Sequence, residues 1–296
     1  MTRILLLGSN GQVGYELVRS LGPLAEIIAP ARIEFDLSAS EQLITDKIQQ
    51  LKPDLVINAA AYTAVDKAEE EVELAWQVNA RAPAVMAASC QSMNIPLIHF
   101  STDYVFDGNS QHPWNEADQT APLNVYGQSK LAGEEAIRDS QVKHAIFRTS
   151  WVYGLRGHNF LNTMRRLARD KAALNIVSDQ IGAPTWSRHI AEAVTAFVAI
   201  ARHQGVSFWD DFNGTYHLSN SGSTSWFGFA EAIFDEMNSL GQTVPAVSPI
   251  TTDAYPTPAK RPLFSVLDNG LLESRLAIKL PHWRQALSQV MQDLQT

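Results

Sequence analysis

Short apolar runs alternate with longer stretches of helical periodicity in the first half of the chain. The apolar runs predict buried strands at residues 4–7, 27–29, 55–58, 97–101 and 145–148. Apolar residues spaced three and four apart predict amphipathic helices at residues 12–20, 40–51, 74–93 and 125–137. Continuous apolar strands that alternate with helices predict a parallel sheet covered on both faces, which is a doubly wound α/β fold.

The second half of the chain is less regular. Helical patterns cover residues 159–170, 187–203, 225–238 and 283–294, and short strand patterns cover residues 175–177, 216–218 and 247–250. This mixture predicts a smaller α/β lobe. We therefore expect a larger domain at residues 1–154 and a smaller lobe made mainly of residues 155–296, with the chain crossing between them more than once.

Composition excludes several classes of protein. The chain has 296 residues, of which 45% are hydrophobic and 18% charged, so we expect a sizeable core. The net charge of −8 and the absence of a basic run argue against nucleic-acid binding. No apolar run is long enough for a signal-peptide core or a membrane span, so we expect a cytoplasmic protein. Cys90, the only cysteine, lies in an apolar helical pattern and is expected to pack in the core.

A glycine-rich turn joins the first predicted strand to the first predicted helix. Gly8, Gly11 and Gly14 are spaced three apart there. Glycines permit a tight turn and close approach of a pyrophosphate, and a helix N-terminus attracts negative charge. The turn therefore predicts a dinucleotide site in a Rossmann-like domain. The alternative is a tight strand–helix turn that binds nothing.

The end of the second predicted strand bears on the choice of cofactor. An acid there would favour NAD, but residues 28–32 contain none and end at Arg32. Arg32 either pairs with the 2′-phosphate of NADPH or is a solvated surface residue. Asp36 and Leu37 are candidates for the adenine edge, although Asp36 equally suits a cap near Ser38.

Tyr126 and Lys130 are the most informative pair in the sequence. Residues four apart share one face of a helix, and Thr102 ends a predicted strand about two dozen residues earlier. This set supplies a proton donor, a cation expected to lower the tyrosine pKa, and a second donor for a carbonyl oxygen. Such a pair often arises by chance. Its combination with the glycine-rich turn is what predicts reduction of a carbonyl by a nicotinamide cofactor.

Seven segments together carry a family resemblance. They span residues 8–14, 58–69, 101–108, 122–134, 147–154, 179–185 and 255–262. In combination they resemble the extended short-chain dehydrogenase/reductases and, more narrowly, the dTDP-4-dehydrorhamnose reductases. The resemblance covers nearly the whole chain. Segments 102–108 and 148–154 separate this group from ordinary sugar-nucleotide epimerases.

The resemblance implies a dinucleotide-binding domain at residues 1–154 and a substrate-binding lobe after it. It implies reduction of the C4 ketone of dTDP-4-dehydro-L-rhamnose to dTDP-L-rhamnose, with NADPH as cofactor and NADH as the alternative. Tyr126 is then the proton donor, Lys130 its partner and a ligand of the nicotinamide ribose, and Thr102 holds the carbonyl. Asp103 and Trp151 line the sugar pocket. The residues expected to contact the cofactor are Gly8, Asn10, Gly11, Gln12, Val13, Gly14, Arg32, Asp36, Leu37, Ala61, Tyr62, Thr63, Tyr126 and Lys130.

Several residues have two interpretations. Arg261, between two nearby prolines, either contacts the substrate diphosphate or forms a structural ion pair. His99 lies on an apolar strand and is expected to be a core histidine rather than a general base. No His, Cys and Asp cluster has metal-ligand spacing. Some relatives bind Mg²⁺ between subunits; Glu16 fits one such position, but Arg188 stands where another acid is expected, so we predict no metal and a monomer or weak homodimer.

Two rival functions share the same fold. An epimerase or dehydratase of nucleotide sugars is less favoured, because dehydratases add acids directly after the catalytic threonine and this chain has only Asp103 there. A regulatory subunit without turnover is the other rival. The presence of both Tyr126 and Lys130 favours an enzyme.

Overall fold

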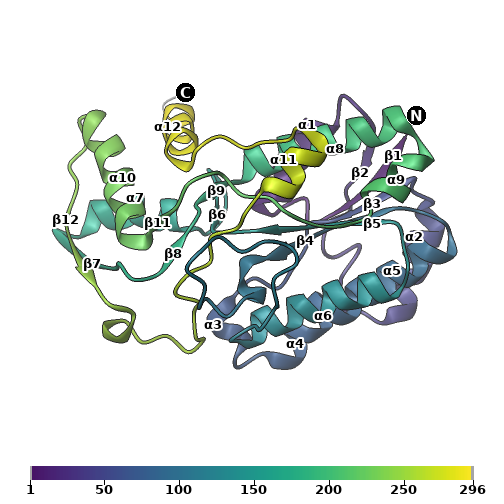
Figure 1. Cartoon of the computed structure of the whole chain (residues 1–296), viewed down its shortest axis with the longest axis horizontal. Helices are drawn as coiled ribbons and strands as arrows, with labels where there is room; N and C mark the ends of the chain where they lie inside the picture. Colours follow the sequence, from purple (N-terminus) through teal and green to yellow (C-terminus); the bar gives the residue numbers. More distant parts are fainter. Residues whose placement is uncertain (1, 295–296) are drawn as a thin grey trace.

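The structure, a computed structural model, describes residues 2–294. Within that range a six-stranded sheet has the order β10-β5-β4-β3-β1-β2, and every neighbouring pair in it is parallel (Figure 1). Its strands are β1 (Arg3–Leu7), β2 (Glu26–Ile28), β3 (Leu55–Asn58), β4 (Leu97–Thr102), β5 (His144–Thr149) and β10 (Gly214–His217).

Helices cover both faces of this sheet (Figure 1). One face carries α1 (Gln12–Leu21), α8 (Ser187–Gln204), α9 (Val206–Phe212) and α11 (Gly270–Leu276). The other carries α2 (Glu41–Leu51), α3 (Val65–Ala68), α4 (Val72–Trp76), α5 (Ala82–Ser92) and α6 (Val125–Asp139). Ile4 and Leu6 belong to one core cluster and Leu5 and Leu7 to another, because successive side chains of a strand point to opposite faces. The doubly wound α/β fold predicted from the sequence is thereby confirmed.

The helix predicted at residues 74–93 is interrupted. A π-helical turn, η1 (Gln77–Arg81), separates α4 from α5. Asn79 in this turn accepts a hydrogen bond from the Tyr62 N–H at 2.8 Å and donates to the Tyr62 carbonyl at 3.0 Å and to Ser129 Oγ at 3.1 Å. The irregular turn therefore ties the segment after β3 to helix α6. Such π turns occur often beside functional sites.

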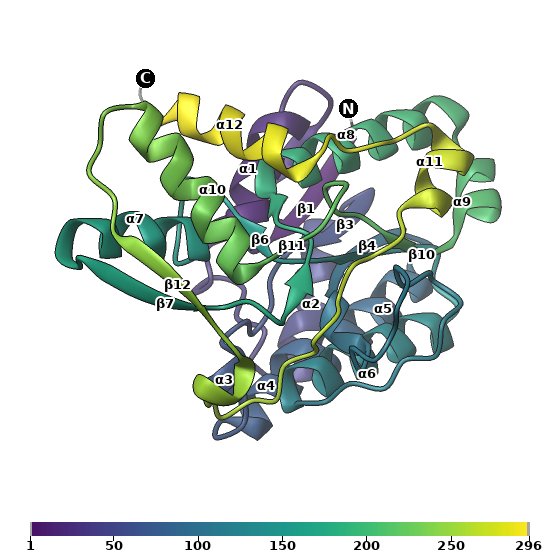
Figure 2. The same ribbon diagram turned by 60° about the vertical axis from the view of Figure 1, so that its left-hand side comes forward.

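The smaller lobe contains three short strand pairs and the helices that pack on them (Figure 2). The pairs are β7 (Ala173–Val177) with β12 (Ala246–Ile250), β8 (Ile181–Gly182) with β11 (Thr224–Ser225), and β6 (Val152–Tyr153) with β9 (Thr185–Trp186). The helices are α7 (Phe160–Asp170), α10 (Trp226–Ser239) and α12 (Trp283–Asp293), and a 3₁₀ turn, η3 (Thr252–Ala254), follows β12. Another 3₁₀ turn, η2 (Asp103–Val105), directly follows β4 of the main sheet and packs on α6. A separate apolar cluster forms the core of this lobe.

Part of the second half completes the central sheet. The sequence pattern placed residues 216–218 in the smaller lobe, whereas β10 pairs with β5 at the edge of the main sheet. The ring of Tyr216 packs against Phe147 of β5 and Phe197 of α8, which joins this strand to the large core. Helix α8 also packs on α1. The division at residue 154 stays a prediction.

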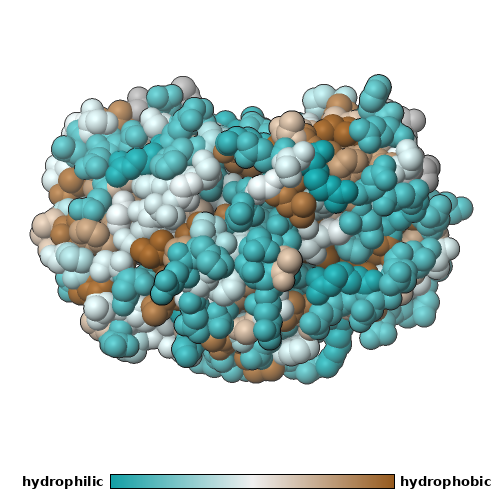
Figure 3. Space-filling view, viewed as in Figure 1, coloured by the Kyte–Doolittle hydropathy of each residue, from teal (hydrophilic) through white to brown (hydrophobic). Residues whose placement is uncertain are grey.

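The face of the molecule seen in Figure 3 is mostly polar, with small apolar areas separated from one another. No helix in residues 2–294 combines the length and apolar character needed to cross a bilayer.

Candidate active site

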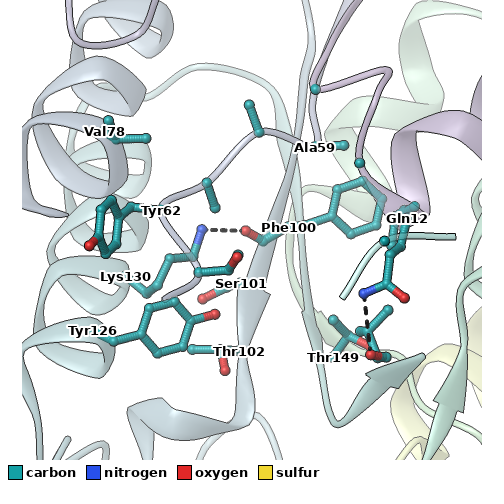
Figure 4. Close-up of a pocket in the computed structure, with 18 of the residues that line it drawn as sticks. Gln12, Ala59, Tyr62, Val78, Phe100, Ser101, Thr102, Tyr126, Lys130 and Thr149 are labelled. Atoms are coloured by element: carbon teal, nitrogen blue, oxygen red, sulfur yellow. Dashed lines mark hydrogen bonds between the residues drawn. The ribbon is translucent and has the colours of Figure 1, made fainter. Parts of the chain in front are cut away.

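A pocket of about 830 Å³ lies at the carboxyl ends of β1, β3, β4 and β5, where the smaller lobe meets the sheet (Figure 4). Parallel α/β sheets bind ligands at this edge. The structure brings together there the sequence-predicted residues Gly8, Asn10, Gly11, Gln12, Val13, Arg32, Asp36, Leu37, Ala61, Tyr62, Thr63, Thr102, Asp103, Tyr126, Lys130, Trp151 and Arg261. Gly14 of the predicted set does not line the pocket.

The glycine-rich turn owes its shape to two close backbone approaches. Gly8 has φ of +81°, and a Cβ there would come within 2.6 Å of the backbone of Ala59 and Ala60. A Cβ on Gly14 would lie 2.1 Å from the Gly8 carbonyl oxygen, so Gly14 serves packing rather than contact. Gly11 caps α1 without a side-chain hydrogen bond. The first N–H groups of α1 are therefore suited to an anion.

The far end of the pocket is formed by the segment after β2. Asp36 accepts hydrogen bonds from the Ser38 N–H at 2.9 Å and the Ser38 hydroxyl at 2.8 Å, and these bonds lower its pKa. Asp36 therefore closes a local turn at Ser38, whereas the N-cap of α2 is Ser40, so the helix cap that the sequence offered as the alternative for Asp36 is not formed. The Arg32 side chain is 77% exposed and lies 3.8 Å from the Asp36 carboxylate. It lines the pocket as a solvated guanidinium, free to turn toward a phosphate.

Helix α6 presents Tyr126 and Lys130 to the same pocket as Thr102 (Figure 4). The helix begins after Asn124, whose side chain accepts from the Gly127 N–H at 2.8 Å and donates to the Lys260 carbonyl at 2.8 Å. This cap fixes the first helical turn. The grouping predicted from sequence spacing is therefore present in the structure.

Burial controls the protonation of the tyrosine. It raises the pKa of Tyr126 above its usual value, and interaction with the Thr102 hydroxyl opposes this only in part. Lys130 does not contribute to this shift of the Tyr126 pKa. Burial also lowers the pKa of Lys130 to about 8, against the attraction of Glu134. The expected lowering of the tyrosine pKa by the lysine is thus not seen, and Tyr126 carries its proton at neutral pH.

Asp103 holds the Thr102 side chain. The Thr102 hydroxyl donates to the Asp103 carboxylate at 3.0 Å, and the Ser150 hydroxyl donates to its second oxygen at 2.9 Å. Asp103 is buried, and burial raises its pKa to about 6 in spite of these bonds and one from Ser265. Asp103 therefore orients a neighbouring hydroxyl as well as lining the pocket.

Trp151 stands in a strained but tightly packed position. Its φ is +45°, a conformation that is rare for bulky residues. Its indole stacks on Trp226 with ring centroids 3.5 Å apart and an angle of 3° between planes. A Cβ on Gly182 would lie 2.4 Å from the Trp151 ring. The ring is therefore clamped between two parts of the smaller lobe, and such strain is typical of functional sites.

Gly182→Ala is expected to push the Trp151 indole off Trp226. Because the ring has no room to yield without breaking the stack, we expect a loss of about 1–3 kcal/mol in the free energy of unfolding. Near-ultraviolet circular dichroism should change as two parallel indoles separate, and Trp151→Phe supplies the reference spectrum for a broken stack. A Gly182→Ala spectrum identical to that of the unchanged protein would contradict the clamp.

Arg261 forms the ion pair that the sequence offered as its alternative role. Its Nη2 lies 2.7 Å from Asp66 Oδ2. Its Nε is buried and makes no hydrogen bond with any described residue. The guanidinium lines the pocket and lies close enough to the Tyr104 hydroxyl to lower its pKa against the larger effect of burial.

Sequence reasoning missed several pocket residues. Trp226 and His158 also line the pocket, and the Asn159 amide donates to Gln12 Oε1 at 2.8 Å. Gln12 in turn donates to the Val152 carbonyl at 3.5 Å (Figure 4). These contacts join the glycine-rich turn to the smaller lobe. No local spacing in the sequence points to them.

Three further residues that the sequence singled out, Cys90, Glu16 and Arg188, do not line the pocket. Cys90 is buried, and burial raises the pKa of its thiol to about 12, as suits a core residue. The Arg188 guanidinium lies 3.5 Å from Glu16 and 2.5 Å from Asp293. A cation of the chain itself therefore stands between these acids. No group of three or more His, Cys, Asp or Glu residues within 2–294 is arranged to hold a metal ion.

A doubly wound sheet, a glycine-rich turn at its first strand and a Thr–Tyr–Lys set at the carboxyl edge define an extended short-chain dehydrogenase/reductase. All of residues 1–296 match the family model described as RmlD substrate binding domain. The chain belongs to this family.

Similar proteins agree over the full length. A dTDP-4-dehydrorhamnose reductase of Burkholderia thailandensis is 46% identical over 297 residues, covering 99% of each chain. The crystal structure of a dTDP-4-dehydrorhamnose reductase from Clostridium acetobutylicum superposes with a TM-score of 0.90, 36% identity and coverage of 100% of both chains. The Bacillus anthracis dTDP-4-dehydrorhamnose reductase, solved in complex with NADP, gives a TM-score of 0.88 at 34% identity, covering 99% of this chain and 100% of its own.

Proposed function

We propose that the chain is an NADPH-dependent oxidoreductase that reduces the C4 ketone of dTDP-4-dehydro-L-rhamnose to dTDP-L-rhamnose. The observation that carries the proposal is the joint presence of Thr102, Tyr126 and Lys130 in one pocket with the glycine-rich turn. The names of the full-length relatives support the substrate. The NADP complex of the Bacillus anthracis relative supports the cofactor.

The pocket residues fit a nicotinamide dinucleotide. The close backbone approach at Gly8 leaves room for a pyrophosphate beside the open N-terminus of α1, which favours its negative charge. Asn10, Gln12 and Val13 line this part, and Ala61 to Thr63 line the next. The bound cofactor supplies the hydride.

The residues of the pocket neutralise and stabilise the negative charge that hydride transfer creates on the ketone oxygen. Negative charge develops on the ketone oxygen, and Tyr126, protonated at neutral pH, gives its hydroxyl proton to that oxygen. The Thr102 hydroxyl donates to Asp103 in the structure, and when it turns to the substrate its single O–H is the second donor that stabilises the same oxygen. Lys130 lies beside them to bind the nicotinamide ribose.

The smaller lobe provides the groups for the rest of the substrate. The clamped Trp151 ring forms a rigid wall for the sugar. Arg261 lines the pocket, and a guanidinium matches the charge and geometry of a diphosphate oxygen. We therefore assign the sugar to the Trp151 side of the pocket and the diphosphate to Arg261.

We predict that Arg32→Ala weakens NADPH selectively. Loss of a charge-assisted contact costs about 1.5–3 kcal/mol, so the KM for NADPH should rise about ten- to a hundredfold. The KM for NADH, which has no 2′-phosphate, serves as the internal control and should stay unchanged. Steady-state kinetics with both cofactors decide the matter, and a preference of the unchanged protein for NADH would contradict it.

Two expectations about the molecule in the cell stay predictions. The sequence predicts a monomer or weak homodimer, and the Arg188 guanidinium between Glu16 and Asp293 favours an assembly without a bridging metal. A cytoplasmic location is also predicted. Sedimentation of the purified protein with and without a chelator tests the first expectation.

The direct test of the proposal follows NADPH absorbance with dTDP-4-dehydro-L-rhamnose generated in situ. Stoichiometric oxidation is expected. An epimerase would leave the cofactor unchanged overall, and a regulatory subunit would oxidise none. Absence of oxidation with both NADPH and NADH would overturn the proposal.

A further inference from the structure

Among the described residues, the Lys130 amine has two polar partners. Its Nζ lies 2.6 Å from the Phe100 carbonyl oxygen and 3.1 Å from Nε2 of His99 (Figure 4 shows the first contact). A carbonyl only accepts, so Nζ donates to Phe100. His99 is buried, and its other ring nitrogen, Nδ1, lies 3.1 Å from the Asn58 amide nitrogen. A chain of contacts therefore runs from β3 through β4 to helix α6.

The orientation of the Asn58 amide is fixed from one end of this chain. The backbone N–H of Ala60 donates to Asn58 Oδ1 at 3.1 Å. A backbone N–H has no lone pair to offer, so the amide oxygen must face it. The amide NH₂ must then face His99 and donate to Nδ1.

This donation decides which nitrogen of His99 carries a proton. Burial, followed by the neighbouring Lys130 and His144, lowers the pKa of His99 well below its ordinary value, so the ring is neutral. A neutral imidazole has one N–H and one lone pair. Because Nδ1 accepts from Asn58, Nε2 bears the proton, and Nε2 points at the Lys130 amine.

The chain of hydrogen bonds has a donor and an acceptor at every contact in one direction only. Each group donates to the next, from the Ala60 N–H through Asn58 and His99 to Lys130 and on to the Phe100 carbonyl. A neutral amine accepts from Nε2–H with its lone pair. An ammonium has no lone pair, so the Lys130 N–H and the His99 Nε2–H would face each other with no acceptor between them. Two unpaired donors in a buried place cost free energy.

We propose that Asn58 and His99 are positioning residues that bias Lys130 toward its neutral amine by presenting Nε2–H to it. The proposal rests on the proposed reductase function, in which Lys130 accompanies the proton donor Tyr126. Lys130 then changes its charge within the working pH range instead of acting as a permanent cation. Burial by itself lowers the lysine pKa to about 8, and the Nε2–H contact acts in the same direction.

Few charged or titratable groups act on the Asn58–His99–Lys130 contacts. Glu134, on the same helix, raises the pKa of Lys130, and His144 of β5 acts on His99. Tyr126 lines the same pocket. None of these groups donates to or accepts from His99 in the structure, so the Asn58 amide and the lysine determine its tautomer.

The tautomer can be measured without any turnover. In protein labelled with ¹⁵N-histidine, nitrogen chemical shifts separate a protonated ring nitrogen from one with a lone pair. We expect His99 to show a protonated Nε2 and a lone pair on Nδ1 at neutral pH, with His99→Gln identifying its signals. A proton on Nδ1 would overturn the proposal.

Asn58→Asp reverses the chain. The carboxylate accepts from both the Ala60 N–H and His99 Nδ1–H, so Nε2 becomes an acceptor for the lysine ammonium. We expect the proton of His99 to move to Nδ1. The apparent pKa of the lysine-dependent limb of the pH–rate profile should rise by about one unit or more. A shifted profile with the proton still on Nε2 would reveal only the added charge and would overturn the proposed chain.

The two proposals fail in different ways. If the unchanged protein does not oxidise NADPH with the nucleotide sugar, the reductase function fails while the tautomer stays measurable. If the protein is an active reductase but His99 carries its proton on Nδ1, the reductase function stands and the positioning role fails.

Discussion

Replacing Tyr126 with phenylalanine is expected to lower kcat by about a hundred- to ten-thousand-fold, the usual contribution of a general acid. Tyr126 lines the pocket beside Thr102, and burial keeps its hydroxyl protonated at neutral pH. Removing the hydroxyl removes the proton that the developing alkoxide requires, while the ring and the cofactor contacts stay. Steady-state kinetics should therefore show the loss in kcat, and NADPH titration should show nearly unchanged binding.

Tyr153→Phe is the matched control. Tyr153 is buried in the smaller lobe, and its hydroxyl makes no hydrogen bond with any described residue. The same loss of one oxygen there should leave kcat nearly unchanged. Retention of most turnover in Tyr126→Phe would exclude Tyr126 as the acid.

Arg148→Met is expected to remove about 3–5 kcal/mol from the free energy of unfolding, because it leaves a buried carboxylate without its main partner. Glu134 on α6 is 0% exposed and Arg148 on β5 is 3% exposed. Arg148 donates to both Glu134 oxygens, through Nε at 2.9 Å and Nη2 at 2.6 Å. This pair joins the helix that carries Tyr126 and Lys130 to the sheet. Urea denaturation measures the loss.

The double variant Glu134→Leu with Arg148→Met tests the cause. When both charges are absent, no carboxylate is stranded, so much of the stability should return. An Arg148→Met variant that loses less than about 1 kcal/mol would show that the ion pair does not anchor the helix. A double variant as unstable as the single one would attribute the loss to packing.

Local pattern was enough to predict most of the central fold. The strands at residues 4–7, 55–58 and 97–101 are buried on both faces, so their apolar runs are continuous and easily recognised. The π turn at residues 77–81 escaped prediction because its apolar pattern differs little from that of an α-helix. The place of β10 escaped because its partner β5 lies about 70 residues earlier in the chain.

The candidate site was predictable to the extent that its chemistry is local. Tyr126 and Lys130 are four residues apart on one helix, and the glycine-rich turn is continuous in sequence. The contacts that position these groups join distant segments: Trp226 reaches Trp151, and Asn58 reaches Lys130 through His99. Such contacts depend on tertiary packing, which no spacing in the sequence encodes.

The most direct test of the proposed function follows the hydride itself. NADPH that carries deuterium at both C4 positions of the nicotinamide is given to the protein with dTDP-4-dehydro-L-rhamnose, and the sugar product is examined by NMR and mass spectrometry. We predict a dTDP-6-deoxyhexose with deuterium at C4 of the sugar, formed by the unchanged protein and very slowly by Tyr126→Phe. Product without deuterium at C4, or no product, would contradict the proposal that this pocket reduces the C4 ketone.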